Sequence, residues 1–163
     1  MKRSSLIVRQ RHGFTLVEIL VVVTLVVVLS LIGSINVLRS RMTGHETVTI
    51  ANLRQLAVAL QMYNSTNNAY PDPLGLLSDA TPPFATSSLT GGSGQNGNSD
   101  LHGYRYVYTK EGNFDYTVVV DPTAPGVTGS RSFFVDETGI IRHCIGTGAT
   151  VSDPTIEQAP IAC

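Results

Sequence analysis

Proline and charge are scarce in the first part of this chain. No proline occurs in residues 1–70, and Glu18 is the only charged residue in the 22-residue run from Phe14 to Ile35. Without proline, nothing in this part of the chain breaks a continuous helix. A helix of that length spans about 33 Å, which exceeds the roughly 30 Å of hydrocarbon in a bilayer. The run therefore predicts a transmembrane helix over residues 14–35.

Acidic residues are absent before Glu18, so the basic residues there are unopposed. They are Lys2, Arg3, Arg9 and Arg11. The positive-inside rule predicts a cytoplasmic N-terminus, with the chain after about residue 36 on the other side of the membrane. The apolar run is longer than the h-region of a secretory signal peptide, and no small-x-small cleavage site follows it. These features favour a membrane anchor over a simple cleavable signal peptide.

Clusters of catalytic or metal-binding side chains are also lacking. The four histidines are scattered, at His12, His45, His102 and His143. His143 and Cys144 are neighbours in a predicted strand, so their side chains point to opposite faces and cannot act as base and nucleophile. Without residues 1–13 the net charge is near −5, which gives no broad basic surface for nucleic acid. We expect no enzyme activity, no catalytic residue, no specific nucleic-acid binding and no cofactor.

The start of the apolar run carries a specific motif. After the basic leader, GFTLVEILVVV places Phe14 directly after Gly13 and Glu18 as the fifth residue from the junction. This motif resembles the prepilin N-terminus of type IV pilins and type II secretion pseudopilins. The resemblance implies cleavage between Gly13 and Phe14 by a membrane-embedded prepilin peptidase and methylation of the new Phe14 amine. It also implies assembly of many copies into a helical filament, through this segment, by inner-membrane machinery.

Glu18 is expected to act in assembly. A carboxylate in hydrocarbon costs roughly 2.5 kcal/mol or more, so it needs a partner. Cleavage would create a charged amine on Phe14, one helical turn away, and the two could pair within one chain. The resemblance implies instead that Glu18 pairs with Phe14 of a neighbouring subunit, where low dielectric strengthens the attraction and offsets desolvation. In the alternative interpretation, Glu18 only reaches toward the membrane interface and has no role in assembly.

The helix is predicted to continue to about Asn64. Its second half repeats apolar residues in steps of four and three, at Thr49, Leu53, Leu56, Leu60 and Tyr63, and Ile50, Ala57 and Val58 widen that face. Asn67 and Asn68 suit a left-handed helix end, and Pro71 prevents continuation. The stretch LRQLAVALQMYNSTNNAYP also resembles the end of a pilin helix.

Strand patterns follow a segment rich in Pro, Gly and Ser that we expect to be a surface loop. Residues 102–109 and 113–120 predict one hairpin, and residues 131–136 and 139–143 predict a second. The fold class is therefore α+β, a long N-terminal helix packed on a small antiparallel β-sheet head. The predicted segments are a basic leader (1–13), the transmembrane and assembly half of the helix (14–35), its amphipathic half (36–70), a connecting loop (71–101), the sheet (102–143) and a disulfide-bounded C-terminal loop (144–163).

The two cysteines, Cys144 and Cys163, both lie in the last 20 residues. With a membrane-directed N-terminus, they favour an oxidising compartment and a disulfide that contributes roughly 3 kcal/mol, with free thiols as the alternative. The Asn- and Asp-rich stretch near residues 91–100 lacks the EF-hand pattern. A structural calcium ion there, or in residues 115–122, is left open.

Three functions remain in competition. The first is a structural subunit of a type IV pilus, made as a single-pass inner-membrane precursor and then exported as an extracellular fibre; roles in adhesion, motility or DNA uptake follow from the resemblance. The second is a pseudopilin of a type II secretion system, assembled as a periplasmic piston. The third is a membrane-anchored binding module that never polymerises. The terminal cysteine pair and the lack of a clear calcium loop favour the pilin.

Overall fold

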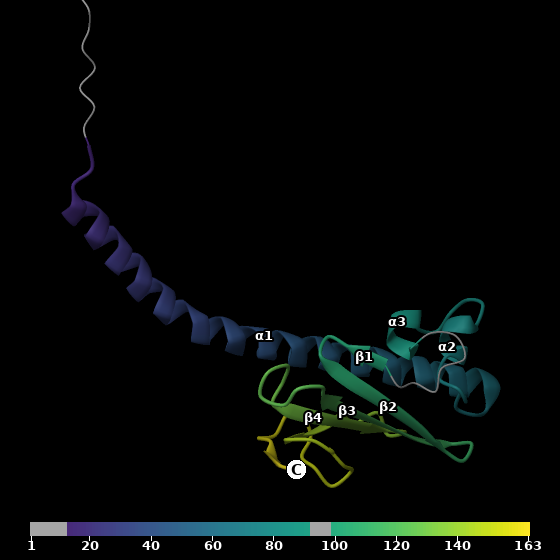
Figure 1. The fold of residues 1–163 in the computed structure, drawn as a ribbon. Coiled ribbons are helices and arrows are strands. Elements are labelled where there is room, and N and C mark those ends of the chain that lie inside the picture. The colour runs from purple at the N-terminus through teal and green to yellow at the C-terminus, as the bar shows by residue number, and fades with distance from the viewer. Residues whose placement is uncertain (1–12, 92–98) are drawn as a thin grey trace, which may run out of the picture. The chain divides into compact units, whose positions relative to one another are not determined.

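The computed structural model describes residues 13–91 and 99–163, and within them the side chains of residues 32–36 lie outside the description. The chain divides into two compact units, Met1–Val37 and Leu38–Cys163. Helix α1 (Leu16–Asn67) begins in the first unit and ends in the second (Figure 1). Of the predicted leader, only Gly13 belongs to the described residues.

In the first unit, the described side chains from Leu16 to Leu31 belong to a helix that is apolar on all sides. Every residue of α1 from Leu16 to Leu31 is exposed, including the seven valines of this stretch. In the part of the chain that is described, no helix is found that is long and apolar enough to cross a membrane. The span predicted for residues 14–35 includes residues 32–36, whose side chains are not described, and it stays a prediction.

The second half of α1 packs as its periodicity predicts. Thr49, Leu53, Leu56 and Leu60 are fully buried against the sheet. The prediction that Val58 widens this face is wrong, because that side chain is 57% exposed and Ala59 is buried instead. The helix ends three residues later than expected, and Asn68 follows it with a left-handed φ of 53°.

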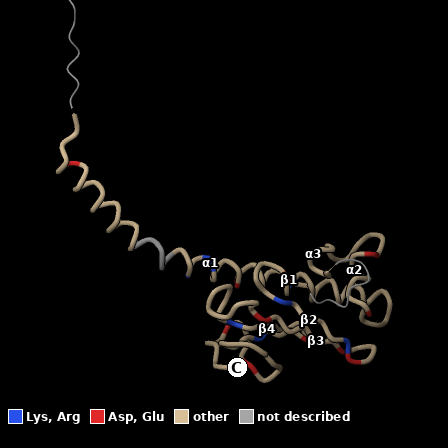
Figure 2. The backbone as a smooth tube through the Cα atoms, in the orientation of Figure 1, with Lys and Arg blue, Asp and Glu red and all other residues tan. Residues whose placement is uncertain are grey.

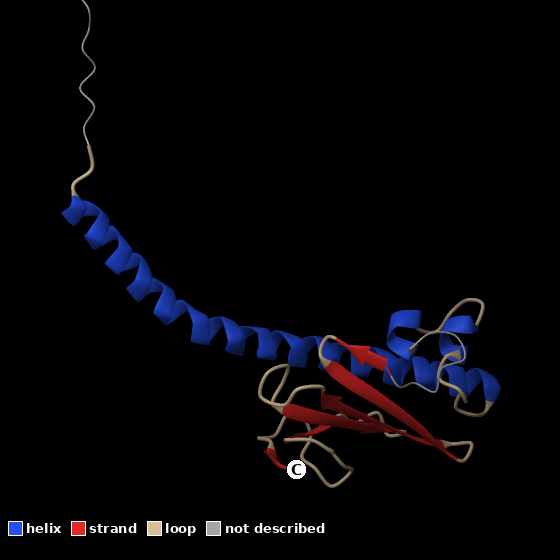
Figure 3. Cartoon of the chain, in the orientation of Figure 1, coloured by secondary structure: helices blue, strands red, loops and turns tan. Residues whose placement is uncertain are grey.

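The head is a six-stranded sheet whose strands follow chain order (Figure 3). The strands are β1 (Ser99–Leu101), β2 (Tyr104–Glu111), β3 (Asp115–Pro122), β4 (Arg131–Asp136), β5 (Arg142–Ile145) and β6 (Ile161–Ala162). Both predicted hairpins are present, as β2–β3 and β4–β5. The predicted bounds are partly wrong, because β2 and β3 each lie two residues later than expected and β5 begins at Arg142 rather than at residue 139. All neighbours are antiparallel except β5 and β6, which are parallel. The edge strands β1 and β6 were not predicted, since two or three residues are too few to show a strand pattern.

The connection after α1 differs from the expected surface loop. It contains two four-residue helices, α2 (Leu76–Asp79) and α3 (Ser87–Thr90). Its apolar side chains enter the main core: Leu74, Leu77, Ala85 and Leu89 are almost fully buried. These four residues follow no regular period, so only the tertiary fold determines which way they face.

Aromatic side chains dominate the core between α1 and the sheet. Tyr104, Tyr106 and Tyr116 are at most 1% exposed, as is Phe133. Buried phenol groups need hydrogen-bond acceptors. The Tyr104 hydroxyl donates to the Arg131 carbonyl at 3.1 Å, and the Tyr108 hydroxyl donates to the Pro71 carbonyl at 2.8 Å. These bonds join strands to distant parts of the chain and fix the order of the layers.

Candidate processing and assembly site

The Gly13–Phe14 junction is open to solvent. Both residues precede the first turn of α1, and the Phe14 side chain is 79% exposed. A Cβ atom added at Gly13 would meet no other atom within 4 Å, and its φ does not lie in the left-handed region. Packing in the described structure therefore gives no reason for glycine at this position. A reason must come from a molecule that contacts the junction.

Thr15 fixes the start of the helix. The backbone N–H of Glu18 donates to Thr15 Oγ1 at 3.2 Å, which is half of a capping box. Glu18 also lies in the first turn, where a carboxylate gains about 0.3–1 kcal/mol from the helix dipole. That gain is smaller than the roughly 2.5 kcal/mol that a carboxylate costs in hydrocarbon. The helix start therefore does not account for Glu18 if this segment lies in a membrane.

The Glu18 carboxylate itself lacks an ionic partner in the described structure. The side chain is exposed, and the two ion pairs found among the described residues, Arg105–Asp100 and Arg131–Glu46, do not include it. The nitrogen of Phe14 is part of a peptide bond to Gly13 and carries no charge. The structure thus places the predicted processing and assembly residues at one end of the helix but does not pair them.

The hydroxyl groups of this segment are already satisfied. Thr24 Oγ1 donates to the carbonyls of Leu20 and Val21 at 3.0 and 2.8 Å, and Ser30 Oγ donates to the Val26 carbonyl at 2.7 Å. Such bonds to the preceding turn let hydroxyl groups enter an apolar environment. Among the described side chains of residues 16–31, Glu18 is therefore the polar group that still needs an external partner.

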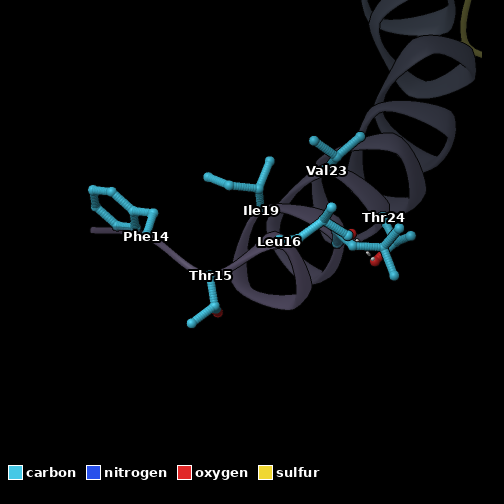
Figure 4. Close-up of a pocket in the computed structure, with 7 residues that line it drawn as sticks. Phe14, Thr15, Leu16, Ile19, Val23 and Thr24 are labelled. Atoms are coloured by element: carbon cyan, nitrogen blue, oxygen red, sulfur yellow. Dashed lines mark hydrogen bonds between the residues drawn. The ribbon is translucent and has the colours of Figure 1, made fainter. Parts of the chain in front are cut away.

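A shallow recess lies beside this helix start (Figure 4). Its lining is mostly apolar and comprises Phe14, Thr15, Leu16, Ile19, Leu20, Val23 and Thr24. One helix and the extended residues before it form its walls, so it is too open to enclose a small molecule. Together with the exposed valines, it forms apolar surface that another molecule or a membrane can cover.

Charged residues are sparse in the first part of α1 and frequent in the head (Figure 2).

The head contains a buried ionic cluster that sequence reasoning missed. The Glu46 carboxylate accepts hydrogen bonds from Ser130 N and Ser130 Oγ, both at 2.9 Å, and from Arg131 Nε at 2.9 Å, with Arg131 Nη2 at 2.7 Å. Arg131 Nη1 lies 3.2 Å from His143 Nδ1, which must accept because arginine only donates. Glu46 and Arg131 are far apart in the sequence, so no motif indicates the cluster.

This cluster is a structural site. Glu46 is 6% exposed, and burial raises the pKa of its carboxyl group. The hydrogen bonds from Ser130 and Arg131 outweigh burial, and the net pKa lies below the ordinary 4.5. The carboxylate is therefore ionised at neutral pH. It attaches α1 to the start of β4 within the second unit.

The cysteine prediction is confirmed, because Cys144 and Cys163 form a disulfide. The calcium prediction is untested, since residues 92–98 lie outside the described residues. In the other candidate range, Asp121 already accepts hydrogen bonds from Ser132 and Gly148. No group of three or more His, Cys, Asp or Glu side chains is gathered in the described ranges 13–91 and 99–163.

A long helix with an apolar first half, a glycine–phenylalanine junction and a β-sheet head is the architecture of a pilin-like subunit. Residues 8–34 match the family model described as the prokaryotic N-terminal methylation motif. The chain is 33% identical over 91 residues to the type IV wide pilus major component PilA4 of Thermus thermophilus, covering 52% of this chain and 68% of that protein. It is 38% identical over 63 residues to the type II secretion system core protein G of Pseudomonas aeruginosa, covering 39% of this chain and 44% of that protein.

The chain belongs to the family of type IV pilins and type II secretion pseudopilins. Proteins of this family are made as membrane-anchored precursors, processed by a prepilin peptidase and assembled into filaments. No solved structure shows a significant match to this chain.

Proposed function

We propose that this chain is a structural subunit of a type IV pilus. A prepilin peptidase cleaves it between Gly13 and Phe14, the Phe14 amine is methylated, and copies polymerise through the apolar half of α1. The precursor spans the inner membrane once with a cytoplasmic N-terminus, and the assembled subunit is extracellular. The role is mechanical and involves no catalytic residue.

The observation that carries this proposal is the state of Glu18. It is the one described polar side chain in residues 16–31 that no bond among the described residues satisfies, and it lies one turn from the nitrogen that cleavage would release. Methylation leaves that amine cationic. An ion pair with the Phe14 amine of a neighbouring copy would satisfy both groups and fix the axial position of each added subunit.

A pseudopilin of a type II secretion system is the second candidate. The match to the secretion protein supports it through a slightly higher identity, over a shorter stretch. The pilus component supports the first candidate through the larger share of both chains that it covers. The two functions differ in where the filament ends, outside the cell or within the periplasm.

The test is N-terminal analysis of filaments from the native host. Cells are sheared, the released material is inspected by electron microscopy, and the first residue of this protein is identified by mass spectrometry. We expect extracellular filaments whose subunit begins with methylated Phe14. Cleaved protein found only in the periplasm would favour the pseudopilin, and filaments built from subunits that keep residues 1–13 would overturn both.

A further inference from the structure

The outer edge of β5 is covered by the end of the same chain. His143 N donates to the Pro154 carbonyl at 2.9 Å, and Ile156 N donates to the Ile141 carbonyl at 3.2 Å. Further along, Cys163 N donates to the Ile145 carbonyl at 3.1 Å, within the parallel pairing of β6 with β5. We call residues 153–163 the C-terminal arm. The arm satisfies backbone groups that an open sheet edge would present to other chains.

The arm is held mainly by main-chain bonds. Its one apolar side chain packed against the main core is Ile156, and both residues of β6 are exposed. Two side chains of β5 bind arm carbonyls: Arg142 Nη1 donates to Asp153 at 3.1 Å, and His143 Nε2 lies 3.1 Å from Gln158. The remaining attachment is the disulfide. Apart from that crosslink, β5 could make the same contacts with the arm of any copy of the chain.

The segment before the arm has two parts. Residues 146–149 form a root that is bonded to the rest of the head, and residues 150–152 form a hinge. Gly146 N donates to the Ser130 carbonyl, Gly148 N donates to Asp121, and Ala149 is buried beside Phe134. Val151 and Ser152 are exposed, and the turn around them is local, because its hydrogen bonds to the Asp153 carboxylate come from Thr150. A change of backbone direction at residues 150–152 would lift the arm while leaving the root in place.

We propose that the β5 edge is an interaction surface for the C-terminal arm of a second copy of this chain, and that the disulfide confines each arm to its own sheet. Exchange of identical elements between copies requires no new contact, because the exchanged arm makes the bonds seen in one chain. Without the crosslink, the fraction of molecules whose arm has left the β5 edge should rise about 100-fold, because the disulfide no longer closes the loop between the two cysteines. This inference does not depend on filament assembly.

The decisive experiment mixes two full-length variants in detergent micelles, Cys144→Ser and Cys163→Ser, each with one thiol. Glutathione disulfide oxidises the mixture, and each new disulfide passes two electrons and two protons to it. If arms exchange, Cys163 of one variant lies against Cys144 of the other and a covalent heterodimer forms. We expect peptide mass spectrometry to find this link in at least about tenfold excess over Cys163–Cys163 homodimers, since templated pairing raises effective concentration. Homodimers in equal or greater yield would overturn the proposal.

A second measurement uses Cys163→Ser alone and separates arm exchange from association through the apolar helix. Exchanged and unexchanged arms make the same contacts with β5, so the discriminating change is a shorter hinge, which hinders an arm from reaching its own sheet. Val151 and Ser152 are exposed in the hinge, and Val127 is 56% exposed in the loop before β4. By light scattering, the Cys163→Ser chain should dimerise with rising concentration, deleting Val151 and Ser152 from it should strengthen the dimer, and adding Val127→Lys should leave it unchanged. A monomer at all concentrations, or a dimer that the deletion does not strengthen, would contradict the proposal.

Discussion

Two glutamates on the same helix meet opposite environments. Glu46, in the head, is buried and receives hydrogen bonds from Ser130 and Arg131. Glu18, in the apolar half of α1, is exposed and has no ionic partner among the described residues. The chain itself completes one acidic site, while the described residues leave the other without an ionic partner, as the proposed pairing with a second copy requires.

The surfaces around the two glutamates differ in the same way. Residues 16–31 are apolar on every side, a pattern typical of helices that are covered on every side. From Thr49 onward, α1 is apolar on one face, which the sheet covers. The head thus covers its apolar face and pairs Glu46 with Arg131, whereas the first half of α1 presents an apolar surface that a lipid or protein environment could cover.

The largest effect is expected from Glu18→Ala. The variant should still be processed and inserted in the membrane, because neither step uses the ion pair, but it should form no filaments. Immunoblots of membranes and electron microscopy of sheared material measure the two properties. Thr24→Val is the matched control, since that hydroxyl already bonds its own helix and its loss should leave filaments intact. Normal filaments from cells that carry Glu18→Ala would contradict the proposed role of Glu18 in assembly.

The next effect concerns the stability of the head. Glu46→Gln keeps the shape of the side chain but leaves Arg131 without a counter-ion. The Arg131 side chain is only 26% exposed, so water does not replace the lost partner fully. Removing one partner of such a pair should lower the free energy of unfolding by about 3 kcal/mol. Thermal unfolding of full-length protein in micelles measures the loss. The control is Asp100→Asn, which breaks the exposed pair with Arg105 and should cause no measurable change.

The same cluster predicts how stability depends on pH. Because the pKa of Glu46 is lowered in the folded state, its contribution is present above pH 4.5 and is lost as pH falls through the folded pKa. Unfolding temperatures measured from pH 7 down to pH 3 should decline in the acidic range, and the decline should be smaller in Glu46→Gln. Equal declines in the two proteins would show that other carboxyl groups cause the acid sensitivity.

Sequence reasoning succeeded where the pattern was local or periodic. The buried face from Thr49 to Leu60 follows from helical spacing, and β2–β3 follows from two aromatic and β-branched runs around a short turn. It failed for α2 and α3, where irregularly spaced apolar residues become buried only through tertiary contacts. It also failed for Glu46, because its partners Ser130 and Arg131 lie at the start of β4, far along the chain, and nothing near Glu46 marks it as buried.

The smallest effect expected is a gain in stability at the turn of α1 before Glu46. Gly44 is exposed inside the helix, and an added Cβ would meet no atom within 4 Å. Gly44→Ala should therefore raise the free energy of unfolding by about 1 kcal/mol, because alanine loses less backbone entropy in a helix.

Gly112 provides the matched control for Gly44→Ala. Its surroundings are equally open, but its φ is +77°. Alanine there should cost roughly 1–2 kcal/mol, so the two substitutions should change the unfolding temperature in opposite directions. If Gly44→Ala has no effect, the head alone holds α1 helical at this point. A gain would show that intrinsic helix propensity also stabilises α1 where it enters the head.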